Sequence, residues 1–179
     1  MRALRKAFNQ MLTSCLLVAT ATPAIAQSPE MARLAKALAG DWSSVEVVQF
    51  GKPVPEGAGR RGATHVRVAG GGTVLVDEGH TVGAVGGDLQ WFTSIWWDTE
   101  AHRYRMLTCY KAPDAHGCEL RGTLHWAGDT LVNEYVEAST RMRDVWTDIT
   151  PTSYTLTEQH DNGHGIMQPY VVSHISKMP

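Results

Sequence analysis

The chain carries little excess charge, has few cysteines and lacks long apolar runs. Its 179 residues include 16 basic and 18 acidic side chains, a formal charge of −2, so no basic surface indicates nucleic-acid binding. Three cysteines are too few for a small disulfide scaffold. The absence of heptads and of a glycine triplet period excludes coiled coils and collagen. The 43% hydrophobic content is ordinary for a folded chain, and the length fits one domain with a sizeable core.

The sequence also lacks the short motifs of familiar enzyme classes. It contains no Ser-His-Asp motif, nucleophile elbow, P-loop or dinucleotide fingerprint. It contains no C-x-x-C either, which argues against a redox-active thiol pair. These absences do not exclude catalysis, because catalytic groups can come together from distant strands.

Residues 1–26 have the pattern of a secretory signal peptide. Three basic side chains precede a mostly apolar stretch over 11–21, and an Ala-x-Ala cleavage site ends at Ala26. The apolar stretch is shorter than the roughly 20 residues that span a bilayer, which favours cleavage over a membrane anchor. We therefore predict a single mature domain, residues 27–179, that is periplasmic or secreted. It would carry 13 basic and 18 acidic side chains, a formal charge of −5.

One short helix is predicted, followed by a run of strands. Ser28-Pro29-Glu30 provides an N-cap, a first-turn proline and an early acid, and Gly40 ends the helix. The apolar stripe of this helix is expected to cover a surface such as a barrel mouth. Short β-branched and aromatic runs then alternate with turn residues. They predict ten strands, at 42–50, 63–68, 73–80, 89–97, 103–111, 118–126, 130–137, 140–149, 154–160 and 166–176.

The predicted strands follow one another through short turns, with no helical segment between them. Parallel β-α-β units are therefore excluded, and a meander of this kind closes most simply into a barrel without exposed edges. The predicted fold class is all-β, an antiparallel up-and-down barrel of about ten strands with a short N-terminal capping helix. Residues 51–61 form a long loop, either a flap or a surface connection, and Asn162-Gly163 predicts a type I′ hairpin turn.

A Gly40-x-Trp42 motif lies where the predicted helix meets the first strand. This arrangement resembles the calycin superfamily, which includes lipocalins and fatty-acid-binding proteins. More closely, the mature chain resembles the domain-of-unknown-function 1579 family of small bacterial barrels, which are often exported. The landmarks of the resemblance are Gly40, Trp42, Trp97, Asp98, Tyr104, Gly122, Arg143, Trp146, Asp161 and Gly163. The resemblance implies a calycin-like barrel that binds a ligand, and it implies no reaction.

The resemblance also implies a structural plug at one end of the barrel. In calycins the first-strand tryptophan closes one end, and a late basic residue packs over it. Trp42 and Lys177 occupy these places in this sequence. Such a cation–π pair would contribute about 0.5–2 kcal/mol.

Aromatic side chains on alternate strand positions are candidates for a ligand site, because a barrel interior takes every second residue. Trp91, Tyr110 and Tyr135 are the predicted aromatic walls. Aromatic residues of this kind either fill a core, where they bury a large area, or line a ligand cavity.

Arg143 is the predicted anchor of the ligand. An inward guanidinium needs a carboxylate partner in a low-dielectric interior. That partner is either a ligand carboxylate, held bidentately as in the related fatty-acid-binding barrels, or Glu134 or Asp144 of the protein. A solvated outer face is the third alternative for this side chain. His125, on a neighbouring predicted strand, completes the predicted ligand-binding set.

The eight histidines lead to no predicted metal or cofactor. His160 and His164 flank a predicted hairpin tip and offer two ligands, whereas structural zinc needs four. A haem-binding barrel relative uses a late-strand histidine, which His174 resembles in position, but the rest of that pattern is missing.

Cys109 and Cys118 are the two cysteines of the predicted mature chain, and they flank a short loop. If the adjoining strands pair, the two side chains come opposite each other. An oxidising compartment would then permit a disulfide, which is predicted here and which would contribute about 2–3 kcal/mol for so small a loop.

The predicted function is non-covalent binding of a small, partly apolar and carboxylate-bearing molecule inside an exported barrel. An enzyme is the first alternative, an isomerase or hydrolase acting in the cavity through His125 or His80. A structural or partner-binding envelope protein with a filled barrel is the second alternative. Neither a nucleic-acid partner nor a membrane span after signal cleavage is expected.

Overall fold

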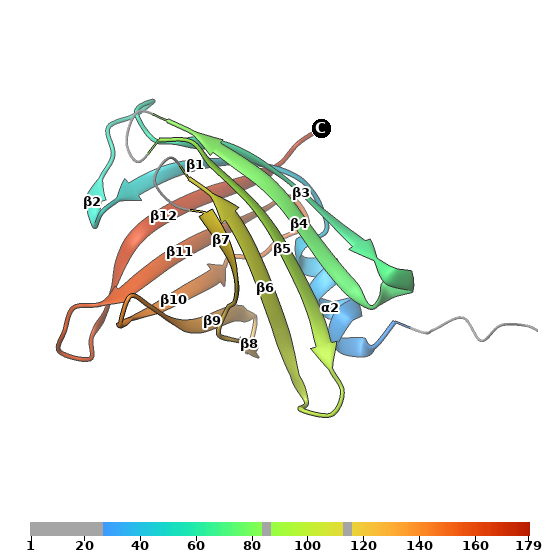
Figure 1. Ribbon diagram of the computed structural model, residues 1–179. Coiled ribbons are helices and arrows are strands. Elements are labelled where there is room, and N and C mark those ends of the chain that lie inside the picture. The colour runs from blue at the N-terminus through green and yellow to red at the C-terminus, as the bar shows by residue number, and fades with distance from the viewer. Residues whose placement is uncertain (1–26, 84–86, 113–115) are drawn as a thin grey trace, which may run out of the picture.

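The computed structural model describes residues 27–83, 87–112 and 116–179, which form a closed ten-stranded antiparallel barrel with one short helix (Figure 1). The predicted all-β fold class is therefore confirmed. The helix is α2 (Pro29–Leu38), and a 3-10 turn, η1, covers Gly70–Gly72. The strands are β1 (Gly40–Gln49), β2 (Lys52–Pro53), β3 (Arg61–Ala69), β4 (Val74–Val82), β5 (Leu89–Asp98), β6 (Arg103–Lys111), β7 (His116–Leu120), β8 (Thr123–Ala127), β9 (Thr130–Glu137), β10 (Thr140–Thr147), β11 (Ser153–Asp161) and β12 (Met167–Lys177).

The barrel is an up-and-down meander that closes between its first and last strands. Neighbours in the chain are neighbours in the sheet from β3 to β6 and from β8 to β12, while β1 pairs with both β3 and β12. The closing register places Trp42 opposite Lys177 and Ser44 opposite Ile175. The two short strands, β2 and β7, pair only with β1 and β6 respectively.

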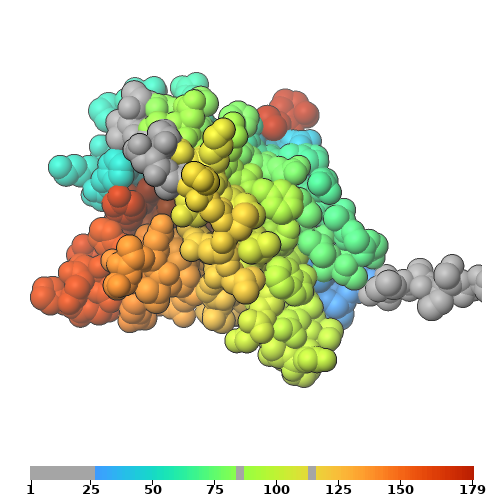
Figure 2. Space-filling view, viewed as in Figure 1, coloured from blue at the N-terminus to red at the C-terminus, as the bar shows by residue number. Residues whose placement is uncertain are grey.

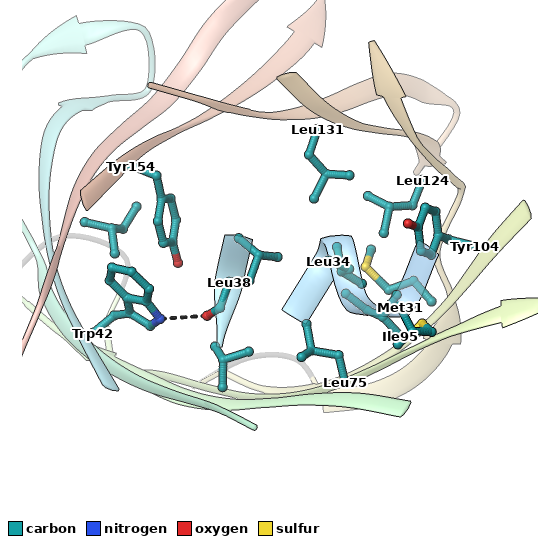
Figure 3. Close-up of a cluster of buried hydrophobic side chains, with 13 residues drawn as sticks. Met31, Leu34, Leu38, Trp42, Leu75, Ile95, Tyr104, Leu124, Leu131 and Tyr154 are labelled. Atoms are coloured by element: carbon teal, nitrogen blue, oxygen red, sulfur yellow. Dashed lines mark hydrogen bonds between the residues drawn. The ribbon is translucent and has the colours of Figure 1, made fainter. Parts of the chain in front are cut away.

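The helix α2 plugs one end of the barrel. The Ser28 side chain caps it by accepting a hydrogen bond from the Met31 amide at 3.2 Å, as the sequence predicts. Met31, Leu34 and Leu38 turn inward with at most 6% exposure. Figure 3 shows them surrounded by side chains from strands on all sides of the barrel. A helix this short depends on such packing, since an isolated helix of its length is marginal in water.

The predicted strand 118–126 is two strands in the structure, interrupted at Arg121 and Gly122. Gly122 has φ +54°, and a Cβ there would lie 2.1 Å from the Glu134 carbonyl oxygen. Only glycine permits this close approach, so the chain changes direction there. As a result β7 pairs with β6 alone, and in Figure 2 its yellow spheres lie above the orange spheres of the β9–β10 hairpin.

Two further expectations need correction. The loop predicted over 51–61 contains the short strand β2, which pairs antiparallel with the end of β1. The Asn162-Gly163 turn is not a type I′ hairpin, because Asn162 lacks a positive φ and five residues separate β11 from β12. Asp161 organises this loop instead, since its carboxylate accepts hydrogen bonds from the Gly163 and Gly165 amides at 2.8 and 2.9 Å.

The sulfur atoms of Cys109 and Cys118 lie 2.14 Å apart, the distance of a disulfide bond. The two residues are direct partners in the β6–β7 register. The bond therefore links β7, which pairs with no strand other than β6, covalently to the barrel wall. The predicted signal peptide, residues 1–26, lies outside the described residues. Across the ranges that are described, no helix is both long and apolar enough to cross a membrane.

Candidate functional site

The inward-facing side chains change character along the barrel axis. Near α2 they are apolar and almost completely buried, as Leu75 and Leu131 show with 1% and 0% exposure. Farther from the helix, the same strands turn polar and aromatic side chains inward, most of them only half-buried. An inward side chain of a closed sheet keeps contact with solvent only where the interior is not filled. This part of the interior is called the polar half here, and it includes Asp77, Trp91, Tyr110, Tyr135, Asp144 and Glu158.

Two carboxyl groups lie side by side in the polar half. Asp144 on β10 and Glu158 on β11 are direct cross-strand partners. The Asp144 carboxylate accepts hydrogen bonds from Asn133 Nδ2 and from the Tyr135 hydroxyl, each at 3.2 Å. The Glu158 carboxyl has no hydrogen-bond partner among the described residues, so its oxygens are available to another molecule.

The two carboxyl groups hold their protons differently. Burial raises the pKa of Asp144 to about 6, although hydrogen bonds from Asn133 and Tyr135 favour its ionised form. Burial also raises the pKa of Glu158 to about 8, and the negative charges of Asp144 and Glu46 act in the same direction. Burial and the mutual repulsion of the two groups therefore favour one bound proton on the pair near neutral pH, and the protonated form is favoured more strongly at Glu158.

Two arginines approach the polar half, and each already has a carboxylate partner from the protein. Arg60 donates to Glu46 Oε1 through Nε and Nη2, both at 2.9 Å. Arg121 donates to Glu119 Oε1 at 2.7 Å and to the Tyr135 hydroxyl at 3.3 Å. The Arg121 guanidinium also lies 4.7 Å from the centroid of the Tyr135 ring. Because each guanidinium already has a carboxylate partner, neither one is dedicated to the pair formed by Asp144 and Glu158.

A second carboxylate site lies on the opposite wall of the polar half. Asp77 on β4 accepts a hydrogen bond from Trp91 Nε1 at 3.1 Å and another from the Thr64 hydroxyl. Burial raises the pKa of Asp77, against the effect of these two donors. The Trp91 indole lies directly over Gly79, where a Cβ would be 2.2 Å from the ring. Gly79 therefore provides the space that keeps the Trp91 ring against the wall.

The three predicted aromatic walls face the interior. Trp91, Tyr110 and Tyr135 each occupy the inward face of their strand and are half-buried. Arg121 connects two of them, since its guanidinium lies 5.9 Å from the Tyr110 ring centroid as well as close to Tyr135. The sequence therefore identified residues that the fold brings to one region, although no described contact shows a ligand there.

The predicted anchor Arg143 and its neighbour His125 lie elsewhere. Arg143 Nε donates to Glu134 Oε1 at 3.0 Å, and these two residues are direct cross-strand partners on the face opposite Asp144. His125 is exposed on the corresponding outer face of β8. The predicted inward position of Arg143 is therefore wrong. Its carboxylate partner is Glu134 of the protein itself, one of the alternatives that the sequence left open. His80, the other histidine considered for catalysis, is also exposed.

The residues of the predicted plug lie together at the end of the barrel closed by α2. Trp42 is 1% exposed, and its indole N–H donates to the Leu38 carbonyl oxygen at 2.8 Å. Lys177 Nζ lies 5.4 Å from the centroid of the Trp42 ring. Tyr154 meets the same ring edge-on, with the two centroids 5.0 Å apart. The tryptophan thus joins the helix, the first strand and the last two strands.

Asp144 and Glu158 were not identified as ligand-site residues from the sequence, although a signal for both was present. Asp144 alternates with Met142 and Trp146 along β10, and Glu158 follows Tyr154 and Leu156 along β11. In each strand an apolar face contains one carboxylate. Because apolar faces turn inward, each carboxylate is carried into the barrel.

Two hollows lie at the end of the barrel opposite α2. A groove of about 600 Å³ is lined by Phe50, Lys52, His160 and Pro169 among others. His160 is two residues along β11 from Glu158, on the same strand face, so the groove adjoins the polar half. Tyr170 contacts both flanking rings, with centroid distances of 5.3 Å to Phe50 and 5.1 Å to His160. A smaller pocket of about 240 Å³ on the β9–β10 hairpin is lined by outer-face residues such as Glu134 and Arg141 together with Tyr135 and Met142.

The described residues contain no group of three or more histidine, cysteine, aspartate or glutamate side chains arranged to hold a metal ion. A comparison of the sequence with models of known protein families gives no match, and a comparison with curated proteins gives none. The resemblance to the domain-of-unknown-function 1579 family therefore stays a prediction, and what identifies the protein is its architecture: a closed antiparallel β-barrel plugged at one end by a helix.

Proposed function

We propose that the protein binds a small, partly apolar molecule in the polar half of the barrel interior. The observation that carries this proposal is the Glu158 carboxyl, which faces the interior and has no hydrogen-bond partner in the described part of the chain. Ligand sites in proteins combine apolar and aromatic walls with a few convergent polar groups. Trp91, Tyr110 and Tyr135 supply such walls beside Glu158 and Asp144.

The groove at the barrel mouth supports an access route to this site. It is large enough for a small molecule, at about 600 Å³, and His160 connects it along β11 to Glu158. The aromatic contacts among Phe50, His160 and Tyr170 give its wall an apolar surface. A ligand entering there would meet aromatic rings first and carboxyl groups deeper in the barrel.

Export belongs to the same proposal. The signal-like pattern of residues 1–26 and the bonded distance between Cys109 and Cys118 both support a periplasmic or secreted protein, because structural disulfides persist in oxidising compartments. The proposal includes membership of the calycin-like barrels, which the order of the sequence landmarks supports.

Native mass spectrometry of protein isolated from the periplasm tests the binding proposal. We expect a co-purified adduct that Trp91→Ala loses, because the substitution removes an aromatic wall. Arg143→Ala is the matched control, since it lies on the outer face and should keep the adduct. If the wild-type protein carries no adduct, and no small alkyl probe binds it in calorimetry, the proposal is overturned.

Catalysis in the interior is the second candidate function. One observation favours it, namely that Asp144 and Glu158 are adjacent and hold their protons differently near neutral pH, which is typical of acid–base pairs. Mass analysis of the ligand released from the protein tests this candidate. A chemical change produced by the wild-type protein but not by Glu158→Gln supports an enzyme, and recovery of the unchanged molecule in both cases argues for binding alone.

A further inference from the structure

We propose that the ligand carries a protonated amine, which binds between Glu158 and Asp144. This inference rests on the proposed function, because it specifies the headgroup of the molecule held in the polar half.

The charges of the polar half favour a cation. Glu46 is 6% exposed and is neutralised by Arg60, with which it forms contacts of 2.9 Å. Arg121 is shared between Glu119 and, at 3.8 Å, Glu137. No arginine within reach is therefore dedicated to the Asp144–Glu158 pair. An anionic headgroup would add a further negative charge beside the Asp144 carboxylate, whereas an ammonium group would supply the missing positive charge.

The unpaired polar atoms of the interior point to the same chemistry. Thr81 and Asn133 are 8% and 0% exposed and occupy inward strand faces, yet Thr81 Oγ1 and Asn133 Oδ1 have no hydrogen-bond partner among the described residues. Buried oxygens of this kind are normally paired, because an unmade hydrogen bond costs stability. These two oxygens are enclosed by the protein, and an unpaired donor, Trp126 Nε1, is buried as well. The acceptor that an entering ligand can reach is therefore the Glu158 carboxyl, which has no hydrogen-bond partner among the described residues. An ammonium group offers three donors and no acceptor, so it complements this carboxyl group.

Aromatic rings complete the complementarity. Tyr135 donates its hydroxyl to Asp144, which places the ring beside the carboxyl pair, and Trp91 lies on the facing wall. Aromatic faces attract cations and also accept apolar chains. The ligand class that fits these features is a primary alkyl or arylalkyl amine, with its headgroup at Glu158 and its apolar part among the rings.

Binding of the amine would release a proton. The Glu158 carboxyl is protonated near neutral pH, so it becomes a carboxylate as the ammonium group arrives, and its proton leaves to solvent while the total charge of the site is conserved. The titratable and charged groups near Glu158 are these: Asp144 from β10, Tyr135 from β9, Glu46 from β1, Tyr170 from β12, and Arg60 and Arg121 from adjoining loops. Among them, Asp144 and Glu46 raise the pKa of Glu158 after burial, and the two arginines oppose that effect.

The test is calorimetry of the whole protein with three probes that share one alkyl chain: n-hexylamine, n-hexanol and n-hexanoate. We expect n-hexylamine to bind at least tenfold more tightly than either of the others at pH 8. Its affinity should rise by up to tenfold per pH unit below pH 7 and level off above pH 8, because the proton on Glu158 competes with it. Titrations in buffers of different ionisation enthalpy should show release of a proton at pH 6.

Two matched variants assign the effect to the interior carboxyl group. Glu158→Gln should weaken n-hexylamine binding at pH 8 by tenfold or more, remove the pH dependence and leave n-hexanol binding unchanged. Glu134→Gln makes the same chemical change on the outer face and should change neither. If Glu158→Gln fails to fold, the pH profile of the unaltered protein still decides the matter.

The outcomes separate this inference from the proposed function. If n-hexanol or n-hexanoate binds as tightly as n-hexylamine, or if amine affinity is independent of pH between 6 and 8, the amine headgroup is overturned and small-molecule binding stands. If none of the three probes binds and no co-purified adduct is found, the proposed function fails and the headgroup fails with it.

Discussion

The two ends of the barrel are built by the same strands and have opposite chemistry. On β4, Leu75 packs against the helix, while Asp77 on the same face is a buried carboxylate of the polar half. On β9, Leu131 is fully buried by the helix, and Tyr135, four residues later, donates to Asp144. A few residues of strand therefore separate a packed apolar core from a polar interior whose side chains are mostly half-buried. The apolar contribution to stability is concentrated at the helix end of the barrel, and the proposed binding region lies toward the other end.

This division explains how the protein tolerates costly groups in its interior. Burying a carboxyl group without a dedicated cationic partner costs stability, and Asp77, Asp144 and Glu158 are three such groups. The apolar end compensates through the burial of Trp42 and of the helix side chains, because apolar burial is the main favourable contribution to folding. Proteins commonly accept a less stable functional region on a stable scaffold.

Trp42→Ala should give the largest loss of stability. The substitution removes a fully buried ring that connects α2 with β1, β11 and β12, so we expect the free energy of unfolding to fall by about 4 kcal/mol. Trp91→Ala, which alters the same residue type at the polar end, should cost less than half as much, because the Trp91 ring is only half-buried. Urea unfolding of both variants measures the difference. Equal losses would show that the two ends contribute equally to stability.

Glu158→Gln should stabilise the protein at alkaline pH. The folded protein holds the Glu158 proton to about pH 8, whereas an unfolded chain releases it near pH 4.5. The unfolded state therefore binds fewer protons in this window, and the stability of the wild-type protein should fall as the pH rises from about 4.5 to 8. The glutamine variant escapes this loss and should exceed the wild type by up to about 5 kcal/mol at pH 9, with little difference at pH 4.

Urea unfolding at several pH values checks this prediction, with Glu134→Gln as its control. Arg143 lowers the pKa of Glu134, so that variant should not be stabilised at any pH. A wild-type stability that rises between pH 5 and 8, or a Glu158→Gln variant that is less stable than the wild type at pH 9, would contradict a protonated interior carboxyl.

Replacing both Cys109 and Cys118 by serine should lower the free energy of unfolding by about 2–3 kcal/mol, the effect of opening so small a loop. The change should act on the polar end, because the bond ties β7 to β6 there. We expect faster hydrogen exchange in β7 than in the wild type and unchanged exchange in α2. An intact mass about 2 Da below that of the reduced chain reports the bond, and a mass corresponding to two free thiols would refute it.

Lys177→Met should have the smallest effect. It keeps most of the side-chain stem and removes the charge near the Trp42 ring, so about 0.5–1 kcal/mol should be lost. Because Lys177 lies at the closed end, ligand binding in the polar half should be unchanged. A change in ligand affinity that exceeds the change in stability would show that the two ends are coupled.

Much of the fold follows from local sequence patterns. The Ser28 cap predicts where the helix begins, and alternation with turn residues predicts nearly every strand, because both signals depend on neighbouring residues. The interruption at Arg121 and Gly122 could not be predicted in this way. It depends on the approach of Gly122 to the Glu134 carbonyl oxygen, a contact that exists only after β8 and β9 have paired.

The site could be predicted only in part. Residue alternation places Arg143 and Asp144 on opposite faces of β10. Which of the two faces turns toward the barrel interior depends on how the complete barrel closes. The chemistry of a guanidinium group, which binds carboxylates, favours Arg143 as the anchor. Arg143 lies on the outer face, however, where it pairs with Glu134. The apolar residues beside Asp144 were the better guide, since burial of Met142 and Trp146 turns that face inward. The same reasoning identifies Glu158, whose neighbours on its own face are Tyr154 and Leu156.

The pairing of β1 with β12 has a consequence for how the protein folds. The hairpins from β3 to β6 join residues that are close in the chain, whereas the closing pair brings Trp42 to Lys177 from opposite ends. Contacts of such long range make folding slow, and the barrel cannot close before its final strand is available. A chain that stops short of β12 would expose the edges of β1 and β11 together. Loss of eleven C-terminal strand residues would thus turn a closed barrel into an open sheet that invites intermolecular pairing.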